Sequence, residues 1–108
     1  MIEQVRSEEF GDRVLDSPLP VLVVFTAAWC GPCKWLHPHL EEVASRTGGS
    51  LRIFEVDVDV APGLAERYRI GSVPTVVWIQ GGDEVERSVG VEPDRLMAWA
   101  ERFTRPGR

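Results

Sequence analysis

The sequence predicts an α/β fold in which helices cover both faces of a central mixed β-sheet. Strand-like and helix-like segments alternate along the first part of the 108-residue chain, a β-hairpin follows them, and a helix closes the chain. A continuous β-branched and aromatic run at residues 21–25 is typical of a central strand buried on both faces. The length and the 44% hydrophobic content predict one domain over residues 1–108, with a core that needs no disulfide staples.

The N-terminal elements are predicted from short local patterns. Residues 2–5 are expected to form a brief first strand. Ser7 is expected to cap a helix through its hydroxyl group, because apolar residues then recur at helical spacing over residues 10–15. Pro18 and Pro20 end this helix before the central strand begins.

The later elements are predicted in the same way. Apolar residues recur at helical spacing over residues 36–44, so an amphipathic helix is expected to follow the central strand and to stop at Gly48-Gly49. Pro38 removes a backbone hydrogen bond within this helix and is expected to kink it. The remaining predictions are a strand at 51–58, a short helix at 62–68, strands at 75–79 and 84–89 joined by a tight Gly81-Gly82 turn, a helix from Pro93 and a frayed tail at 104–108.

Charge and hydropathy exclude several classes of protein. Lys and Arg number 12 against 17 Asp and Glu, and the net charge of −5 lacks the basic footprint of a nucleic-acid binder. The longest apolar run, residues 21–29, is too short to cross a membrane. Residues 1–6 contain no basic segment that leads into an apolar stretch, so no secretory signal is expected and a cytoplasmic, reducing location is predicted.

The two cysteines lie in the motif Trp29-Cys30-Gly31-Pro32-Cys33-Lys34, where the central strand gives way to the next helix. Free N–H groups and the dipole at a helix N-terminus stabilise a thiolate, and Lys34 adds a positive charge nearby. Cys33 falls on the same helix face as Cys30 one turn later, so the two sulfur atoms can meet. The pattern predicts thiol–disulfide exchange, in which Cys30 attacks a partner disulfide and Cys33 then attacks Cys30 to release the reduced partner.

Two other interpretations of the cysteine pair are weaker. A zinc site would need further ligands, and His37 and His39 are two residues apart on a helix, where they point to different faces. An inert buried pair is disfavoured by the Gly-Pro turn between the cysteines at a helix start. We therefore expect no metal and no cofactor.

The sequence resembles the thioredoxin family over residues 5–103. The resemblance is carried by the Trp29–Lys34 motif after a buried strand, Pro38 in the following helix, Ser72-Val73-Pro74-Thr75 before the hairpin, and the later glycines at 81, 82 and 90. Membership would imply a thioredoxin fold and a protein-disulfide reductase, with Cys30 as nucleophile and Cys33 as resolving thiol.

The resemblance also implies how partners are recognised. Val73-Pro74 would be a cis peptide bond beside the two sulfur atoms, and this backbone edge would pair with an extended stretch of the partner. A flat apolar rim would touch the partner and would consist of Trp29, Gly31, Pro32, Val73, Pro74 and Gly90. The expected partners are protein disulfides, with a thioredoxin reductase as electron donor, and the chain is expected to be a monomer that binds neither nucleic acid nor membrane.

Two residues depart from the family pattern. The family usually has a buried Asp six residues before the first cysteine, where this chain has Val24, and a Lys on the neighbouring strand, where this chain has Glu55. Leu51, Ile53 and Glu55 share one face of the predicted strand, so Glu55 is expected to point into the core near Val24. We hypothesise that Glu55, made a better proton acceptor by burial, replaces the absent Asp as the acceptor of the Cys33 proton. The alternatives are that Glu55 reaches a rim, that it pairs with Arg52 or another surface base, or that water takes the proton.

Several aromatic and acidic residues have simpler interpretations. Trp78 and Trp99 are expected in the core, and Trp35 either widens the partner surface or packs locally. Asp57 and Asp59 are expected to be solvated or to cap a helix. A binding module or chaperone that keeps the fold without efficient turnover remains the alternative function, and a dedicated oxidant or isomerase is a weaker third.

Overall fold

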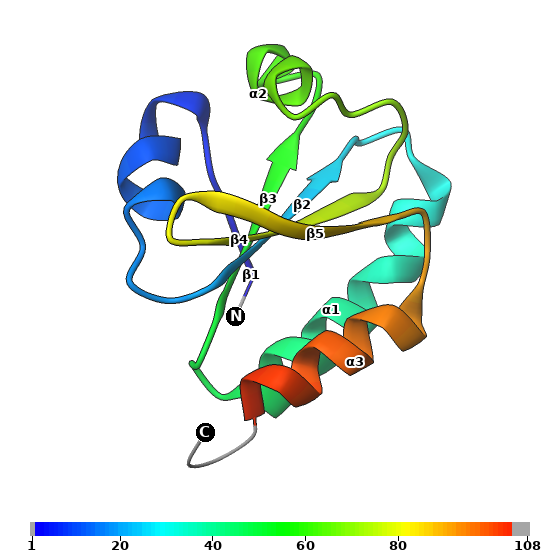
Figure 1. The fold of residues 1–108 in the computed structure, drawn as a ribbon. Coiled ribbons are helices and arrows are strands. Elements are labelled where there is room, and N and C mark those ends of the chain that lie inside the picture. Colours follow the sequence, from blue (N-terminus) through cyan, green and yellow to red (C-terminus); the bar gives the residue numbers. More distant parts are fainter. Residues whose placement is uncertain (1, 105–108) are drawn as a thin grey trace.

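A computed structural model describes residues 2–104 and shows one five-stranded mixed sheet with helices on both faces (Figure 1). The strand order is β1-β3-β2-β4-β5, so the predicted central strand, β2, lies in the middle. β3 pairs with β1 and β2 in parallel, and β4 pairs with β2 and β5 in antiparallel. The elements are β1 (Ile2–Gln4), η1 (Ser7–Glu9), η2 (Gly11–Leu15), β2 (Val21–Thr26), α1 (Gly31–Thr47), β3 (Arg52–Asp57), α2 (Pro62–Arg67), β4 (Thr75–Gln80), β5 (Asp83–Val89) and α3 (Pro93–Thr104).

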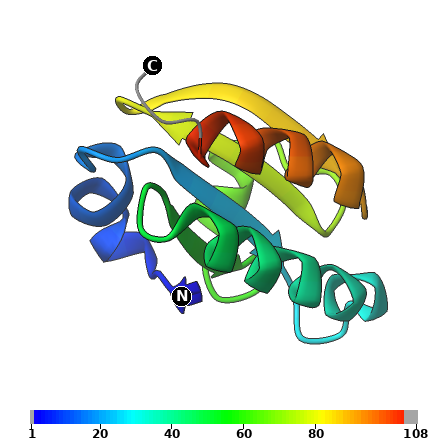
Figure 2. The ribbon, with the colours of Figure 1, turned by 90° about the horizontal axis from the view of Figure 1, so that it is seen from below.

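Both faces of the sheet are covered, as the apolar run of β2 predicts. Val21, Val23 and Phe25 join a cluster with the η1–η2 segment and α2, whereas Leu22 and Val24 join a second cluster with α1 and α3. Figure 2 shows α1 and α3 side by side across one face of the sheet, and the two helices are in contact. Successive side chains of β2 point to opposite faces of the sheet, so this buried strand contributes to both halves of the core.

The first helical segment differs from its prediction. Ser7 does not cap a helix; it is the first residue of the 3₁₀ helix η1, whose N-cap is Arg6. The carboxylate of Glu9 instead accepts the backbone N–H of Arg6 at 3.1 Å. The segment then continues as a π-helical turn, η2, so the hydroxyl of Ser7 lies inside the helical segment and cannot serve as its cap.

The ends of the other elements follow the predicted glycine and proline signals. α1 ends at Thr47, and its C-cap residue Gly48 adopts the left-handed conformation that is common after a helix C-terminus. Gly81 and Gly82 both have positive φ and form a two-residue turn between paired Gln80 and Asp83. Thr104, expected in the frayed tail, is the last residue of α3, and residues 105–108 of that predicted tail lie outside the described residues.

The packing of α3 against the sheet gives a stability prediction. The indole of Trp99 is 1% exposed, lies 5.7 Å from the Trp78 ring and donates a hydrogen bond to Glu86 at 3.0 Å. Trp99→Ala should lower the free energy of unfolding by about 3–5 kcal/mol, because it leaves a large cavity. The same change at Trp35, which is 70% exposed, should cost less than about 0.5 kcal/mol. Urea denaturation of both variants measures the difference, and equal losses would contradict this description of the core.

Candidate active site

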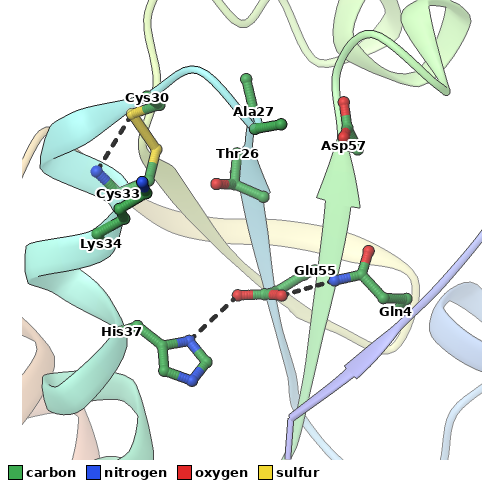
Figure 3. Close-up of a pocket in the computed structure, with 10 residues that line it drawn as sticks. Gln4, Thr26, Ala27, Cys30, Cys33, Lys34, His37, Glu55 and Asp57 are labelled. Atoms are coloured by element: carbon green, nitrogen blue, oxygen red, sulfur yellow. Dashed lines mark hydrogen bonds and ion pairs between the residues drawn. A yellow bond between two sulfur atoms is a disulfide. The ribbon is translucent and has the colours of Figure 1, made fainter.

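The cysteine pair lies at the junction of β2 and α1. β2 ends at Thr26, α1 begins at Gly31, and Cys30 occupies the N-cap position of the helix. The backbone N–H of Cys33 donates to Cys30 Sγ at 3.1 Å, and the two cysteines form a disulfide (Figure 3). A helix N-terminus that already directs an N–H at this sulfur favours negative charge on it when the disulfide is reduced.

The two cysteines differ in exposure in this oxidised state. Cys30 is buried, with 3% of its surface exposed, whereas Cys33 is half-buried. The two sulfur atoms thus differ in two ways: a helix N–H is directed at Cys30 Sγ, while Cys33 has more of its surface open to solvent.

The Val73–Pro74 segment, which precedes β4, lies beside the disulfide. The Val73–Pro74 peptide bond is cis, and Cys30 Sγ lies 3.6 Å from the carbonyl oxygen of Val73. The N–H of Gly90, at the end of β5, donates to the carbonyl oxygen of Pro74 at 2.8 Å. Gly90 has positive φ, a conformation that glycine adopts without strain. This geometry brings Gly90, Pro74 and Cys30 together from distant parts of the sequence.

The predicted apolar rim is only partly exposed. Trp29, Gly31 and Pro32 are exposed, and Val73 and Gly90 are half-buried. Pro74 is buried, and its contact with partners stays a prediction. The Pro74 ring lies beneath the surface because Pro74 leads directly into β4. Every residue of this strand except the last is buried.

Asp57 and Asp59 hold the exposed tryptophan of the motif in place. Asp57 Oδ1 accepts the backbone N–H of Asp59 at 2.9 Å, which stabilises the turn after β3. Asp59 Oδ2 in turn accepts the indole N–H of Trp29 at 2.8 Å. The expectation that these residues are simply solvated or cap a helix is therefore incomplete, because Asp59 positions Trp29.

A pocket of about 280 Å³ opens beside the disulfide. Cys30, Cys33 and Lys34 line it from the motif, and Glu55 lines it from β3. The rest of its wall is formed by Gln4, Thr26, Ala27, Ala28, His37 and Asp57. The pocket thus brings the acid that was singled out in the sequence, Glu55, to the same space as both cysteines.

Glu55 lies on the sheet face predicted for it. It is paired in register with Val24 of β2 and Gln4 of β1, and Leu51 and Ile53 belong to the buried cluster on that face. Its side chain is 18% exposed, because it borders the pocket and is not enclosed in the core. Val24 itself is buried among apolar side chains, so the position of the missing Asp contributes no titratable group.

The contacts of Glu55 include two residues that the sequence analysis did not assign to the site. Gln4 Nε2 donates to Glu55 Oε1 at 2.7 Å, and His37 Nδ1 lies 3.5 Å from Glu55 Oε2 (Figure 3). Arg52, the alternative partner, is not among the contacts described for Glu55. The four-residue spacing from Cys33 to His37 was a signal for the histidine, since it places both side chains on one helix face. No local pattern indicates Gln4, which reaches Glu55 through strand pairing.

The structure places the remaining tryptophans clearly. Trp78 and Trp99 are buried, as predicted, and Trp35 is exposed. Within residues 2–104, no group of three or more His, Cys, Asp or Glu side chains is placed to hold a metal ion. Over the same residues, none of the helices has the length and apolar character that spanning a membrane requires.

The chain matches a family model and is similar in sequence to known thioredoxins. The family model described as Thioredoxin matches residues 1–102. Thioredoxin 1 of Nostoc sp. is 41% identical over 95 residues, which cover 88% of this chain and 89% of the relative. A bifunctional thioredoxin reductase/thioredoxin of Mycobacterium leprae is 45% identical over 89 residues, which cover 82% of this chain and 19% of the relative.

A plant thioredoxin and a solved thioredoxin structure are also similar to this chain. Chloroplastic thioredoxin M4 of Arabidopsis thaliana is 37% identical over 103 residues, which cover 94% of this chain but 53% of the relative, so the chain spans about half the length of that protein. The crystal structure of Malassezia sympodialis thioredoxin has a TM-score of 0.86 at 27% identity and covers 97% of this chain and 91% of that chain. The fold, the family model and these relatives together show that the chain belongs to the thioredoxin family.

Proposed function

We propose that this protein is a protein-disulfide reductase that works through the reversible Cys30–Cys33 dithiol. The observation that carries the proposal is the disulfide at the N-terminus of α1, with the Cys33 N–H directed at Cys30 Sγ. A binding module would need no such pair at a helix start. The alternative of a chaperone without turnover is therefore not favoured.

The reduced protein would act in two steps. The Cys30 thiolate attacks a partner disulfide, forms a mixed disulfide and releases one partner sulfur as a thiolate. Cys33 then loses its proton and attacks Cys30 Sγ, which breaks the bond to the partner and closes the Cys30–Cys33 disulfide. Two electrons pass from the dithiol to the partner, and the proton of Cys33 must go to an acceptor in the site.

Glu55 is the acceptor that we propose for that proton. It lines the same pocket as Cys33, and its carboxylate is held by Gln4 on one side and His37 on the other. A base that reaches the proton directly or through one water molecule meets the geometric requirement of general-base catalysis. Asp57 also lines the pocket, but its Oδ1 is engaged with the turn at Asp59.

The partner side of the proposal rests on the rim and on one relative. Extended segments of protein disulfide substrates would lie across Trp29 and Val73, beside the buried Pro74 and Gly90. A thioredoxin reductase would return the electrons, which the fused Mycobacterium leprae relative supports. We place the activity in a reducing compartment such as the cytoplasm, because a dithiol of this kind must be kept reduced between turnovers, and we take the working form as a monomer.

Insulin reduction tests the assignment of the two cysteines. With dithiothreitol as electron source, the wild-type protein should accelerate insulin precipitation and Cys30→Ser should not. Cys33→Ser should instead accumulate a mixed disulfide with the substrate, visible as an added mass, because the resolving thiol is gone. If Cys30→Ser traps the adduct and Cys33→Ser does not, the roles of the two cysteines are reversed. If the wild-type protein binds insulin without accelerating precipitation, the protein is a binding module.

The proton-acceptor role of Glu55 has its own test. Glu55→Gln should slow insulin reduction by roughly tenfold at about pH 7, less than the usual effect of a lost general base because water can enter the open pocket. Asp57→Asn is the matched control, since it also neutralises a carboxylate of the pocket, and it should stay close to wild type. A loss of rate in Asp57→Asn with none in Glu55→Gln would assign the acceptor to Asp57.

A further inference from the structure

His37 lines this pocket and contacts Glu55, but the mechanism so far gives its imidazole no part in the proton transfer. Helix α1 carries Cys33, His37 and Glu41 at intervals of four residues, which places the three side chains on one helix face. Cys33 and His37 both line the pocket beside the disulfide. The turn of helix that follows the resolving cysteine therefore presents an imidazole to the space in which the proton must be taken up.

The two ring nitrogens of His37 face two different carboxylates. Nδ1 lies 3.5 Å from Glu55 Oε2, and Nε2 lies 3.2 Å from Glu41 Oε2. Gln4 donates to the other oxygen of Glu55, Oε1, so Oε2 is the oxygen left to face the imidazole. The exposed fraction of these side chains rises from 18% for Glu55 to 47% for His37 and 56% for Glu41. The imidazole thus connects the inner carboxylate to one at the helix surface.

A single carboxylate is poorly matched to a thiol as a proton acceptor. In unperturbed groups the pKa is about 4.3 for a glutamate carboxyl, about 6.5 for an imidazole and about 8.5 for a thiol. A base works best when its pKa lies near the working pH, so an imidazole in contact with the carboxylate improves the match.

We propose that His37 shares the proton that Glu55 accepts from Cys33, so that the two side chains act as one acceptor. This inference rests on the reductase function proposed above. His37 acts through Glu55 and is therefore a positioning residue, not a catalytic residue. Its role follows from the placement of Nδ1 opposite the one oxygen of Glu55 that Gln4 leaves free.

In the second half of the reaction, Cys33 gives up its proton and closes the disulfide with Cys30. The Cys33 Sγ–H bond breaks, the Sγ of Cys33 bonds to the Sγ of Cys30, and the partner sulfur leaves with the electron pair of its bond to Cys30. The proton passes to Glu55 Oε2, directly or through one water molecule, and is then held between Oε2 and His37 Nδ1. Solvent removes it from the exposed side of the imidazole before the next turnover.

Two carboxylates contact the imidazole, and two further charged side chains line the same pocket. Glu41 faces it from α1 and Glu55 faces it from β3. Lys34 of α1 and Asp57 of β3 line the same pocket. Imidazole side chains as a class change charge within the range of pH 5 to 8, so the proposal is tested across that range.

The pH profile of His37→Gln tests the proposal. The variant should reduce insulin roughly fivefold more slowly than wild type at about pH 7, and the deficit should vanish towards about pH 9, where a thiol ionises without help. A variant that only disturbs the helix would be slower at every pH. His39→Gln is the matched control, because it is the same change on the same helix outside the pocket, and it should follow the wild-type profile.

Two further measurements separate this proposal from the reductase function itself. The double variant His37→Gln/Glu55→Gln should be no slower than Glu55→Gln alone, because the pair works as one unit. Added imidazole should restore the rate of His37→Ala near neutral pH. A wild-type profile in His37→Gln, or additive losses in the double variant, would overturn the role of His37 while leaving the reductase function intact. Absence of insulin reduction by the wild-type protein would overturn the reductase function first.

Discussion

The hydrogen bond from the Cys33 N–H to Cys30 Sγ is the interaction on which the rest of the site depends. It exists because β2 ends at Thr26 and α1 starts at Gly31, so the sulfur of Cys30 takes the N-cap position of a 17-residue helix. The N–H of Cys33, one of the groups without an intrahelical partner in the first turn, then faces a sulfur instead of solvent. This one junction brings the two sulfur atoms together and directs an N–H at Cys30 Sγ.

The sheet provides the second constraint, because strand register decides which acid reaches the cysteines. Val24 is buried beneath α1, and the acidic group of the site lies one strand away at Glu55. Parallel pairing of β1 with β3 brings Gln4 to one oxygen of this carboxylate, and α1 brings His37 to the other. The acid therefore lies in a pocket that it shares with both cysteines and His37.

Most of the fold and the cysteine centre could be predicted because they depend on local patterns. The apolar run of β2, the glycines at 48, 81 and 82 and the helix start at the cysteine motif each specify their own geometry. Ser7 failed as a cap because a 3₁₀ turn and a π turn compete with a regular helix there. The contacts of Asp59 with Trp29, and of Gln4 with Glu55, were missed because tertiary packing joins residues that no local spacing relates.

The redox potential of the Cys30–Cys33 pair tests the central claim most directly. Equilibration with glutathione or dithiothreitol buffers, followed by thiol alkylation and mass spectrometry, measures the fraction of disulfide at each potential. A reducing disulfide reductase of this family should give one two-electron transition at about −270 mV, the value typical of thioredoxin. A pair that does not interconvert reversibly, or one with a midpoint above about −180 mV in the range of isomerases and oxidants, would contradict the account.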